Sequence, residues 1–428
     1  MNEKAKTKRK FFTPMLVACA VLAVMVANVS AGDIYYIDNC AILNVSGATY
    51  YLTTDIIDSS ATTCMNITAE NVTLDCQGHK IDGKDRISTI GIYSNQSNTT
   101  VRNCLVTDWE EGIVFKGSNN SIIENTTLDS NHLGGICLFS SSGCTIANNT
   151  VSNSEAGIGL ESSNNNRIIN NDASSNYEYC IILRYSAYNT ITNNNASNSE
   201  YGIFLYEASY NTITNNTANS CNDGAISLDK SNNNILANNT AKHSNFGIYI
   251  SLSSNNTVKN SRIENNIKYG IYMYSAGKNH IYNNLFNNTR NCRIEGNLYA
   301  NNWNTTKQAG TNIVGKPYIG GNYWGRPDGT GFSEKCEDAD GDGFCDKPYL
   351  LEKNNIDYLP LTLTGPPASI TNLHNVTYEQ TYINWTWNDP TDADFSHVMV
   401  YLNGVFQTNV SKGVQFYNAT GLTPDTEY

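Results

Sequence analysis

Positively charged residues and long apolar stretches are both scarce in this 428-residue chain. It contains 27 Lys and Arg residues against 39 Asp and Glu, and five of the basic residues precede one apolar run that ends near residue 29. This run and the small residues Val29-Ser30-Ala31 predict a signal peptide over residues 1–31. No second apolar run approaches the roughly 20 residues that a membrane span needs. The sequence therefore predicts a secreted or cell-surface protein, with membrane contact only through the N-terminal segment or a missing C-terminal region.

Removal of residues 1–31 would leave 22 basic and 38 acidic residues, a net charge of −16. A chain this acidic repels the phosphates of nucleic acids and attracts cations. We therefore expect no nucleic-acid partner.

Strong helix formers are also rare between residues 91 and 283, where Ser, Asn, Thr and Gly separate regularly spaced apolar residues. One phrase occurs nine times there: Gly-Ile-x-Leu, about nine residues of loop, then Ile-x-Asn, with small variations. Its last residue recurs every 22 or 23 positions, at Asn103, Asn125, Asn148, Asn170, Asn193, Asn215, Asn238, Asn260 and Asn283. Constant columns over nine copies predict stacked coils.

A repeat of this length fits either a leucine-rich repeat or a right-handed parallel β-helix. The leucine-rich repeat needs a helical segment in each coil, and Ser, Asn and Thr disfavour one because their side chains compete for backbone hydrogen bonds. Apolar residues alternate instead, as in Ile203-Phe204-Leu205, which is the period of a strand. The predicted fold class is all-β, with a right-handed parallel β-helix.

The nine recurring asparagines are predicted to form a structural ladder. An Asn at a fixed turn tolerates the left-handed backbone conformation. If its side chain points inward, it can also hydrogen-bond to the Asn above and the Asn below, which satisfies buried polar groups. We therefore expect the nine side chains to face the interior of the coils.

The chain divides into five segments. After the signal peptide, residues 32–90 are predicted to be the N-terminal cap and first coils, residues 91–290 nine regular coils, and residues 291–363 the C-terminal cap. A boundary at Gly365-Pro366-Pro367 precedes residues 366–428. That last segment contains alternating strands and an Asn403-Gly404 hairpin signal.

Two family resemblances accompany these segments. The repeats, with Leu74-Asp75-Cys76-Gln77-Gly78-His79 before them and Gly320-Gly321-Asn322-Tyr323-Trp324 after them, resemble the NosD-like right-handed β-helix proteins over about residues 33–363. Residues 366–428, with Trp385 and the closing Gly421-Leu422-Thr423-Pro424 up to Tyr428, resemble a fibronectin type III module that stops before its last two strands. The resemblance implies a partial immunoglobulin-like β-sandwich, as part of a longer surface protein.

The NosD resemblance implies the fold and not a copper site. Soft copper sites use clustered His, Met or Cys side chains. The six histidines lie in different segments, and no two of them share a column of the repeat. Copper is therefore not an expected cofactor.

Eleven cysteines remain if Cys19 is removed with the signal peptide. An exported chain is expected to pair most of them, and an odd number leaves at least one thiol free. Spacing alone does not decide the pairing. The short-range candidates are Cys40 with Cys64, Cys76 with Cys104, and Cys336 with Cys345.

An acidic loop in the C-terminal cap is a candidate calcium site. Asp338, Asp340, Asp342 and Asp346 occupy positions 1, 3, 5 and 9 of a calcium-loop pattern that has Gly at position 6. Tyr349 stands where that pattern has its Glu at position 12. The alternative is a polar surface loop closed by a disulfide. Calcium is the one cofactor that the sequence suggests, with the role of ordering the cap.

A second candidate site depends on the stacking of the coils. Four carboxylates, Glu155, Glu178, Glu200 and Asp223, precede the Gly position of successive coils. Tyrosines accompany them at Tyr179, Tyr201, Tyr185 and Tyr206. Carboxylates about 5 Å apart repel one another, which raises their pKa values or attracts a cation. Aromatic faces beside carboxylates suit a glycan, but a solvated acidic ridge with stacked tyrosines is the simpler interpretation.

These patterns lead to two function hypotheses. The first is a non-enzymatic cell-surface β-helix with a structural, adhesive or glycan-binding role, whose partners are envelope polysaccharides or surface-layer components. The second is a carbohydrate-active enzyme, a lyase, hydrolase or epimerase that acts on polyuronates through the acidic column. The sequence favours the first, because carboxylate spacing alone does not define a catalytic site.

Overall fold

A computed structural model describes residues 32–364, 369–391, 395–424 and 426–427. The predicted signal peptide, the Gly365-Pro366-Pro367 boundary and Tyr428 lie outside the described residues. Within the described part of the chain, no helix has both the length and the apolar character needed to cross a bilayer.

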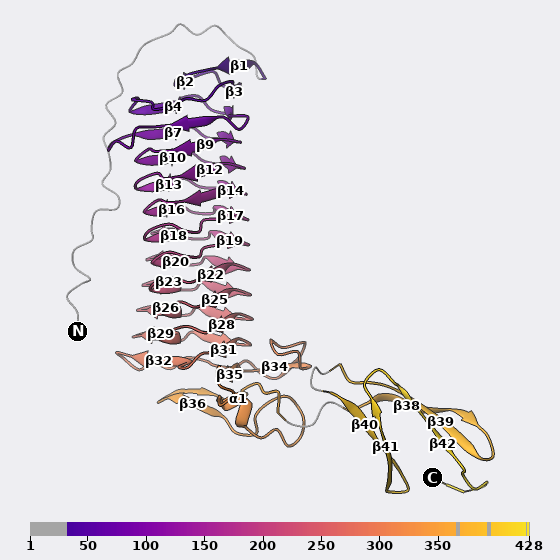
Figure 1. Ribbon diagram of the computed structural model, residues 1–428. Coiled ribbons are helices and arrows are strands. Elements are labelled where there is room, and N and C mark those ends of the chain that lie inside the picture. The colour runs from indigo at the N-terminus through magenta and orange to yellow at the C-terminus, as the bar shows by residue number, and fades with distance from the viewer. Residues whose placement is uncertain (1–31, 365–368, 392–394, 425, 428) are drawn as a thin grey trace.

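Residues 34–325 form a parallel β-helix of about eleven turns, whose strands lie one above the other along a single axis (Figure 1). Each coil contributes strands to two or three parallel sheets. Sheet A has 12 strands: β1 (Ile34–Ile37), β3 (Thr49–Leu52), β5 (Thr73–Asp75), β8 (Thr100–Arg102), β11 (Ile122–Glu124), β14 (Thr145–Ala147), β17 (Arg167–Ile169), β19 (Thr190–Thr192), β21 (Thr212–Thr214), β24 (Ile235–Ala237), β27 (Thr257–Lys259) and β30 (His280–Tyr282).

Sheet B also has 12 strands, and most of them are longer. They are β2 (Ala41–Leu43), β4 (Thr63–Ile67), β7 (Ile90–Ser94), β10 (Glu111–Lys116), β13 (Gly134–Phe139), β16 (Ala156–Glu161), β18 (Tyr179–Arg184), β20 (Tyr201–Tyr206), β23 (Gly224–Asp229), β26 (Phe246–Ser251), β29 (Tyr269–Tyr274) and β32 (Cys292–Glu295).

Sheet C forms the third side in two pieces, which single bridges at Asp172 and Asn195 connect. Its strands are β6 (Lys80–Asp82), β9 (Leu105–Thr107), β12 (Thr127–Asp129) and β15 (Thr150–Ser152), then β22 (Thr217–Asn219), β25 (Thr240–Lys242), β28 (Arg262–Glu264), β31 (Leu285–Asn287) and β35 (Tyr323–Gly325).

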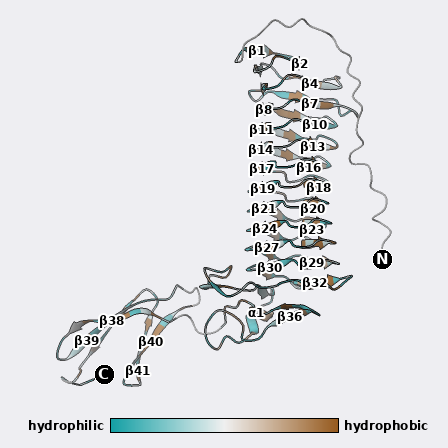
Figure 2. Ribbon diagram, turned by 180° about the vertical axis from the view of Figure 1, so that it is seen from behind, coloured by the Kyte–Doolittle hydropathy of each residue, from teal (hydrophilic) through white to brown (hydrophobic). Residues whose placement is uncertain are grey.

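The apolar columns of the repeat form the core, as the sequence predicts. Like residues pair with like: Ile113 pairs with Ile136, and Ile181 with Ile203. The Ile and Leu side chains of these columns are fully buried. In Figure 2 hydrophobic residues (brown) recur on the strands of the rod and are also present on the antiparallel strands that follow it. Parallel strands about 4.8 Å apart place each apolar side chain on its counterpart in the next coil, so burial is shared between neighbours.

The asparagine ladder exists, but the prediction of which residues form it is wrong by one position. All nine predicted asparagines have a positive φ, between 52° and 57°. Eight of the nine side chains are exposed or half-buried, and only Asn283 is buried. A left-handed residue at the turn directs its side chain outward, and the extended residue after it points inward. The inward ladder therefore consists of Asn149, Asn171, Asn194, Asn216, Asn239 and Asn284, with Thr126 and Ser261 in the same column.

Asn194 shows how one amide serves two coils. Its Oδ1 accepts the backbone N–H of Asn171 at 2.9 Å and the Asn171 side-chain amide at 3.0 Å. Its Nδ2 donates to Ile168 O at 2.9 Å and to Asn216 Oδ1 at 3.0 Å. A second ladder of the same kind runs through Asn166, Asn189, Asn211, Asn234, Asn256, Asn279, Asn301 and Asn355.

The three candidate disulfides are confirmed. Cys40 bonds to Cys64, Cys76 to Cys104 and Cys336 to Cys345. The first two join adjacent coils at the N-terminal end of the rod, and the third closes the acidic loop. Five of the described cysteines are free, so fewer are paired than the exported setting suggested.

The cap at the C-terminal end is built on buried aromatic rings. It contains β33 (Gln308–Ala309), β34 (Tyr318–Ile319), α1 (Phe332–Lys335), β36 (Tyr349–Glu352) and β37 (Asn355–Asp357). Trp324 stacks on Phe286 of the last regular coil, with ring centroids 4.7 Å apart. Asn322 and Asn355 accept the last bonds of the two ladders. Where the cap meets the last coil, it therefore continues the asparagine hydrogen bonds that join the regular coils.

Antiparallel strands follow the cap (Figure 1). A three-stranded sheet contains β38 (Thr371–Tyr378), β39 (Tyr382–Asn388) and β42 (Phe416–Thr420), and a two-stranded sheet contains β40 (His397–Leu402) and β41 (Val405–Ser411). The predicted hairpin is confirmed: Asn403 and Gly404 have positive φ values of 49° and 77° between the paired strands β40 and β41.

Candidate functional site

The outer face of sheet B carries aromatic side chains in two columns. Ile203 and Leu205 point into the core, so the fourth position of the strand, Phe204, points outward between them. The Tyr201 ring lies against Phe204, so the first position of the strand is on the same outer face. Register places Tyr201 over Tyr179 and Phe204 over Ile182. Equivalent outward positions therefore lie side by side on successive coils.

The outward aromatic residues form two clusters. In the Tyr179 cluster, Tyr179 and Tyr201 stack with centroids 5.4 Å apart and an interplanar angle of 18°, and Phe204 lies 5.1 Å from Tyr201. Ala156 and Ile182 complete this cluster. The Phe246 cluster consists of Phe246, Tyr249, Tyr269 and Tyr272, in which Tyr249 and Tyr272 stack at 5.3 Å.

The predicted acidic column lies along one edge of this aromatic face. Glu155, Glu178, Glu200 and Asp223 immediately precede β16, β18, β20 and β23, and all four are half-buried. Their backbones are joined by hydrogen bonds, such as Glu178 N to Glu155 O at 2.9 Å and Asp223 N to Glu200 O at 2.8 Å. The structure therefore brings the four carboxylates into one column, as the stacking argument required.

The carboxylates and the tyrosines are coupled. The Tyr201 hydroxyl donates a 2.6 Å hydrogen bond to Asp223 Oδ2. Burial, reinforced by the bond to Asp223, raises the pKa of Tyr201 well above its ordinary value. Burial and the adjacent Glu178 do the same to the pKa of Tyr179. Both phenols therefore keep their protons and donate to neighbouring acceptors.

The other two predicted tyrosines lie at the opposite edge of sheet B. Tyr185 is an exposed turn residue with φ of 51°, and its ring meets the Tyr206 ring edge-on at 5.8 Å. Tyr206 also accepts a 3.2 Å hydrogen bond from Lys230, whose ammonium bonds to Glu207 at 3.1 Å. The candidate glycan-binding residues thus lie along both edges of the outer face of sheet B, and they do not converge on one point.

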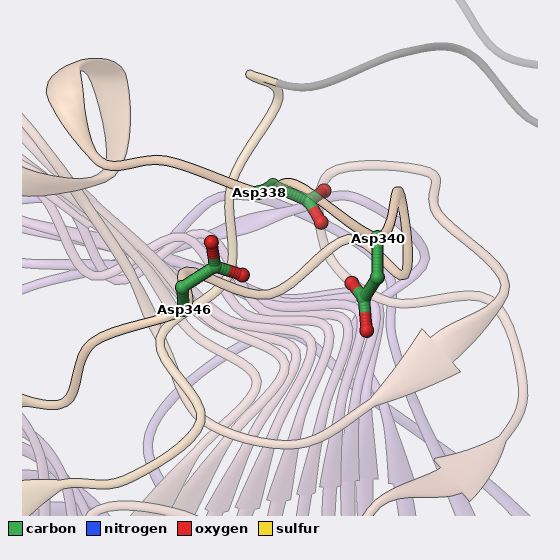
Figure 3. Close-up of side chains that lie close together, drawn as sticks. All are labelled: Asp338, Asp340 and Asp346. Atoms are coloured by element: carbon green, nitrogen blue, oxygen red, sulfur yellow. The ribbon is translucent and has the colours of Figure 1, made fainter.

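The acidic loop of the cap gathers three of its four predicted carboxylates. Oxygens of Asp338, Asp340 and Asp346 lie within 4.8 Å of one another, and Figure 3 shows them around one point of the loop. Asp342 is directed elsewhere and forms a 2.6 Å ion pair with Lys307. Burial raises the pKa of Asp338, whose oxygens accept the backbone N–H groups of Asp342 and Gly343. A pocket of about 300 Å³ borders this loop and is lined by Phe332, Lys335, Asp346 and Lys347 among others.

Four of the five free cysteines, Cys137, Cys144, Cys180 and Cys221, are buried, and Cys292 is half-buried. Burial raises the pKa of Cys180 to about 12, and it raises the pKa values of Cys137, Cys144, Cys221 and Cys292 as well. A thiol is neither a good nucleophile nor a good metal ligand until it is ionised. These five side chains therefore act as small apolar residues in the folded protein.

We expect the buried thiols to resist modification in the native state. Ellman's reagent added to the folded protein should label Cys144, Cys180 and Cys221 at least about 100-fold more slowly than it labels the urea-unfolded chain, because both access and ionisation are suppressed. Peptide mapping after timed quenching measures the rate at each site. Rapid labelling of Cys180 in the folded protein would contradict its burial.

Sequence reasoning missed the Phe246 cluster. Its four rings occupy the same two outward columns as Tyr179, Tyr201, Ile182 and Phe204, so a column-by-column alignment of the repeat contained the signal. The prediction concentrated instead on the coils that carry the acidic residues.

Comparisons with known proteins agree on the β-helix. The family model for periplasmic copper-binding protein (NosD) matches residues 43–217 and 179–329. No curated protein sequence matches the chain. The A-module of a mannuronan C-5 epimerase from Azotobacter vinelandii has a TM-score of 0.52 at 11% identity, covering 63% of this chain and 87% of the epimerase module.

Two further solved structures show a looser likeness. The DFA-IIIase from Arthrobacter chlorophenolicus without its lid has a TM-score of 0.48 at 12% identity and covers 62% of this chain and 87% of its own. The Dettilon tailspike protein has a TM-score of 0.44 at 13% identity and covers 92% of this chain and 85% of its own. At such identities, structural likeness concerns the fold alone.

Proposed function

This chain belongs to the family described as periplasmic copper-binding protein (NosD), and from that premise we propose that it is an extracytoplasmic, non-enzymatic β-helix that binds glycans of the cell envelope. The proposed binding surface is the outer face of sheet B. Its partners would be envelope polysaccharides or surface-layer components.

The observation that carries this proposal is the pairing of aromatic rings with carboxylates along one face of a rigid rod. Tyr201 and Phe204 offer half-exposed apolar surface, and Asp223 and Glu200 offer hydrogen-bond acceptors beside it. A pyranose presents C–H groups on its faces and hydroxyl groups at its rim, so it needs both kinds of contact. Repetition every coil, about 4.8 Å, suits a ligand that is itself a repeating chain.

The family's description mentions copper, but the side chains of this protein do not provide a suitable set of copper ligands. Among the described residues, the cluster of three possible ligands consists of carboxylates, Asp338, Asp340 and Asp346. Copper prefers thiolate, thioether and imidazole donors. The free cysteines are buried or half-buried with raised thiol pKa values, and the histidines lie in separate parts of the fold. We therefore assign no role to copper.

A carbohydrate-active enzyme is the alternative function, and one observation favours it. Burial, with a contribution from Glu110, raises the pKa of Glu111 to about 7. A carboxyl group with such a pKa is suited to general acid catalysis near neutral pH. Glu111 lies at the start of β10, on the same face of sheet B as the aromatic clusters.

A glycan array separates the two functions. We expect the protein to retain envelope oligosaccharides, and Tyr201→Ala to weaken binding by about 10-fold, because it removes a stacking face and the partner of Asp223. Tyr188→Ala is the matched control, since Tyr188 belongs to an exposed stack with Tyr210 away from this face. Binding without new reducing ends or unsaturated products supports the non-enzymatic function, whereas turnover would establish the alternative. Absence of binding to any glycan would refute the proposal.

We also propose that Asp338, Asp340 and Asp346 bind a calcium ion that orders the cap. Three carboxylates that converge in one loop are the hard oxygen donors that this ion prefers. The lack of a bidentate Glu at the end of the loop points to a weak site, in the range of extracellular calcium modules. The disulfide between Cys336 and Cys345 holds the loop closed on itself.

Calcium is expected to stabilise the cap. At about 10 mM calcium and a Kd of about 10⁻⁴ to 10⁻³ M, the free energy of unfolding should rise by about 1.4–2.7 kcal/mol. Asp340→Asn should abolish this increase, and Asp342→Asn should preserve it, because Asp342 pairs with Lys307 instead. Denaturation curves with calcium and with a chelator measure the difference. Equal calcium responses of the two variants would remove the proposed site.

The antiparallel sheets of residues 371–420 are proposed to be part of a fibronectin type III-like module. The confirmed hairpin and the pairing of β38, β39 and β42 support this assignment.

A further inference from the structure

The coil that contains β23 interrupts both aromatic columns on the outer face of sheet B, and we infer that it is the subsite at which one neutral pyranose residue of a glycan is held. The inference rests on the proposed glycan-binding function and specifies where and what the protein binds. Gly224, Ser227 and Asp229 supply the floor of the subsite. The two aromatic clusters supply its walls.

Strand register places this coil between the two clusters. Gly224 pairs with Phe246, and Ser227 pairs with Tyr249 on one side and Phe204 on the other. The rings of each cluster stack on one another, so the faces directed toward β23 are those at the ends of the stacks. The strands that carry these end rings are two strand spacings apart, about 9.6 Å. In this structure the rings close over Ser227, which is 0% exposed. If the rings rotate outward, a pyranose can lie between the two strands with an aromatic face on either side.

Polar atoms on this coil lack protein partners. Ser227 points outward from the sheet, yet it is 0% exposed, and its Oγ makes no hydrogen bond to any described residue. The Asp229 carboxylate, two residues later on the same face, bonds to Ser251 and to the Lys230 backbone, but its Oδ1 atom is buried without a partner in the described chain. Buried polar atoms in folded proteins nearly always form hydrogen bonds. Two buried atoms without a hydrogen bond in one coil therefore need an explanation. A bound hydroxyl group would provide the missing partner for each.

Gly224 is needed for this arrangement. A Cβ atom at position 224 would collide with Ser227 Oγ, so the hydroxyl occupies the space that any side chain would take. At the same column, neighbouring coils carry the large residues Tyr201 and Phe246. The missing side chain therefore creates both the interruption in the aromatic column and the room for the serine hydroxyl.

A ligand reaches Ser227 only if the flanking side chains move. Phe204, Phe246 and Tyr249 are half-buried, and none of them forms part of the interior core. Tyr201 is held toward β23 by its 2.6 Å hydrogen bond to Asp223. Rotation of these outer rings leaves the backbone ladder intact, so the closed and open arrangements differ by side-chain torsions and one hydrogen bond.

The charges around the subsite select a neutral sugar. Asp223, Asp229 and Glu200 all lie on or beside this coil, and Lys230 is already bonded to Glu207 and Tyr206. Carboxylates accept hydrogen bonds from sugar hydroxyls. They repel the carboxylate of a uronic acid, and the acidic chain as a whole adds to that repulsion. The chemistry thus points to uncharged hexopyranose residues.

The test compares two substitutions that each remove one hydroxyl group. Ser227→Ala removes a hydroxyl with no protein partner, so we expect its melting temperature to be unchanged or slightly raised. Its affinity for the best-bound neutral hexasaccharide should fall by about 5–10-fold. Thr190→Val, on the outer face of sheet A, removes a hydroxyl away from the subsite and should leave the affinity unchanged. Isothermal titration with cellohexaose, maltohexaose and mannohexaose measures the affinities, with hexamannuronate, hexagalacturonate and a chitosan hexamer as charged comparisons.

Each outcome bears on one proposal. Neutral hexasaccharides that bind, with an affinity loss confined to Ser227→Ala, support the subsite. If the wild type binds a glycan and Ser227→Ala binds it equally well, glycan binding stands and the β23 subsite falls. Preference for the uronates or the amino sugar overturns the neutral ligand class, and a Ser227→Ala protein with a lowered melting temperature overturns the functional role of the hydroxyl. If no oligosaccharide binds, the proposed function fails, and the subsite fails with it.

Discussion

Asn216→Asp is expected to lower the free energy of unfolding by about 3–5 kcal/mol at neutral pH. The Asn216 side chain is 1% exposed, and its Nδ2 donates to Ile191 O at 2.9 Å and to Asn239 Oδ1 at 3.2 Å. Aspartate would place a charged oxygen against these two acceptors. Because the side chain is buried, the charge must either remain unpaired or take up a proton at a cost in free energy.

The neighbouring residue gives a matched control. Asn215 has a φ of 57° and an exposed side chain, so Asn215→Asp should change the free energy of unfolding by less than about 0.5 kcal/mol. Urea denaturation followed by circular dichroism compares the two variants. If Asn215→Asp were the more damaging of the two, the inward ladder would run through the other column and the assignment of the turn would be wrong.

A rise in pH from 4 to 8 is expected to destabilise the cap through Asp357 by up to about 4 kcal/mol. This carboxyl group is 0% exposed, and burial raises its pKa to about 7 even though it accepts N–H groups from Asn322, Trp324 and Leu359. The unfolded carboxyl group ionises near pH 4. The unfolded state therefore loses its proton first, so the stabilisation present below pH 4 is lost as the pH rises toward 7.

Asp357→Asn isolates this contribution. The amide has nearly the same shape and does not titrate, so the pH dependence of the variant should lack the Asp357 component that the wild type shows. Tryptophan fluorescence during denaturation reports on the cap, because the Trp324 Nε1 atom lies 2.9 Å from Asp357 and the Trp303 ring lies 5.7 Å from Trp324. Parallel pH profiles for wild type and variant would show that Asp357 is ionised in the fold throughout this range.

Much of the β-helix could be predicted from the sequence because its core is made by repetition. A column such as Ile113, Ile136 and Ile158 is visible as a period in the chain and buried as a stack in the fold. The direction of each turn residue was harder to predict. Asn193 and Asn194 are chemically identical, and only the backbone conformation decides that the first points out and the second points in.

The candidate sites were predictable to a lesser extent. The order of Glu155, Glu178, Glu200 and Asp223 follows from the period, so their column was foreseen. The partner of Asp342 was not, because Lys307 lies 35 residues earlier in a part of the chain without a repeat. Ser227 was missed for a different reason. Its significance lies in the absence of a partner, which a sequence does not record.

The passage of both amide ladders into the cap has a consequence for the length of the rod. Asn284 donates to Asn322, and Asn301 donates to Asn355, with the geometry that joins any two regular coils. The cap therefore joins the last coil through the same amide bonds that join regular coils, together with the Trp324–Phe286 stack that is specific to the last coil. Whole repeats of 22 or 23 residues could be gained or lost upstream without disturbing that junction. The length of the β-helix could therefore change by whole coils while its two end caps stay the same.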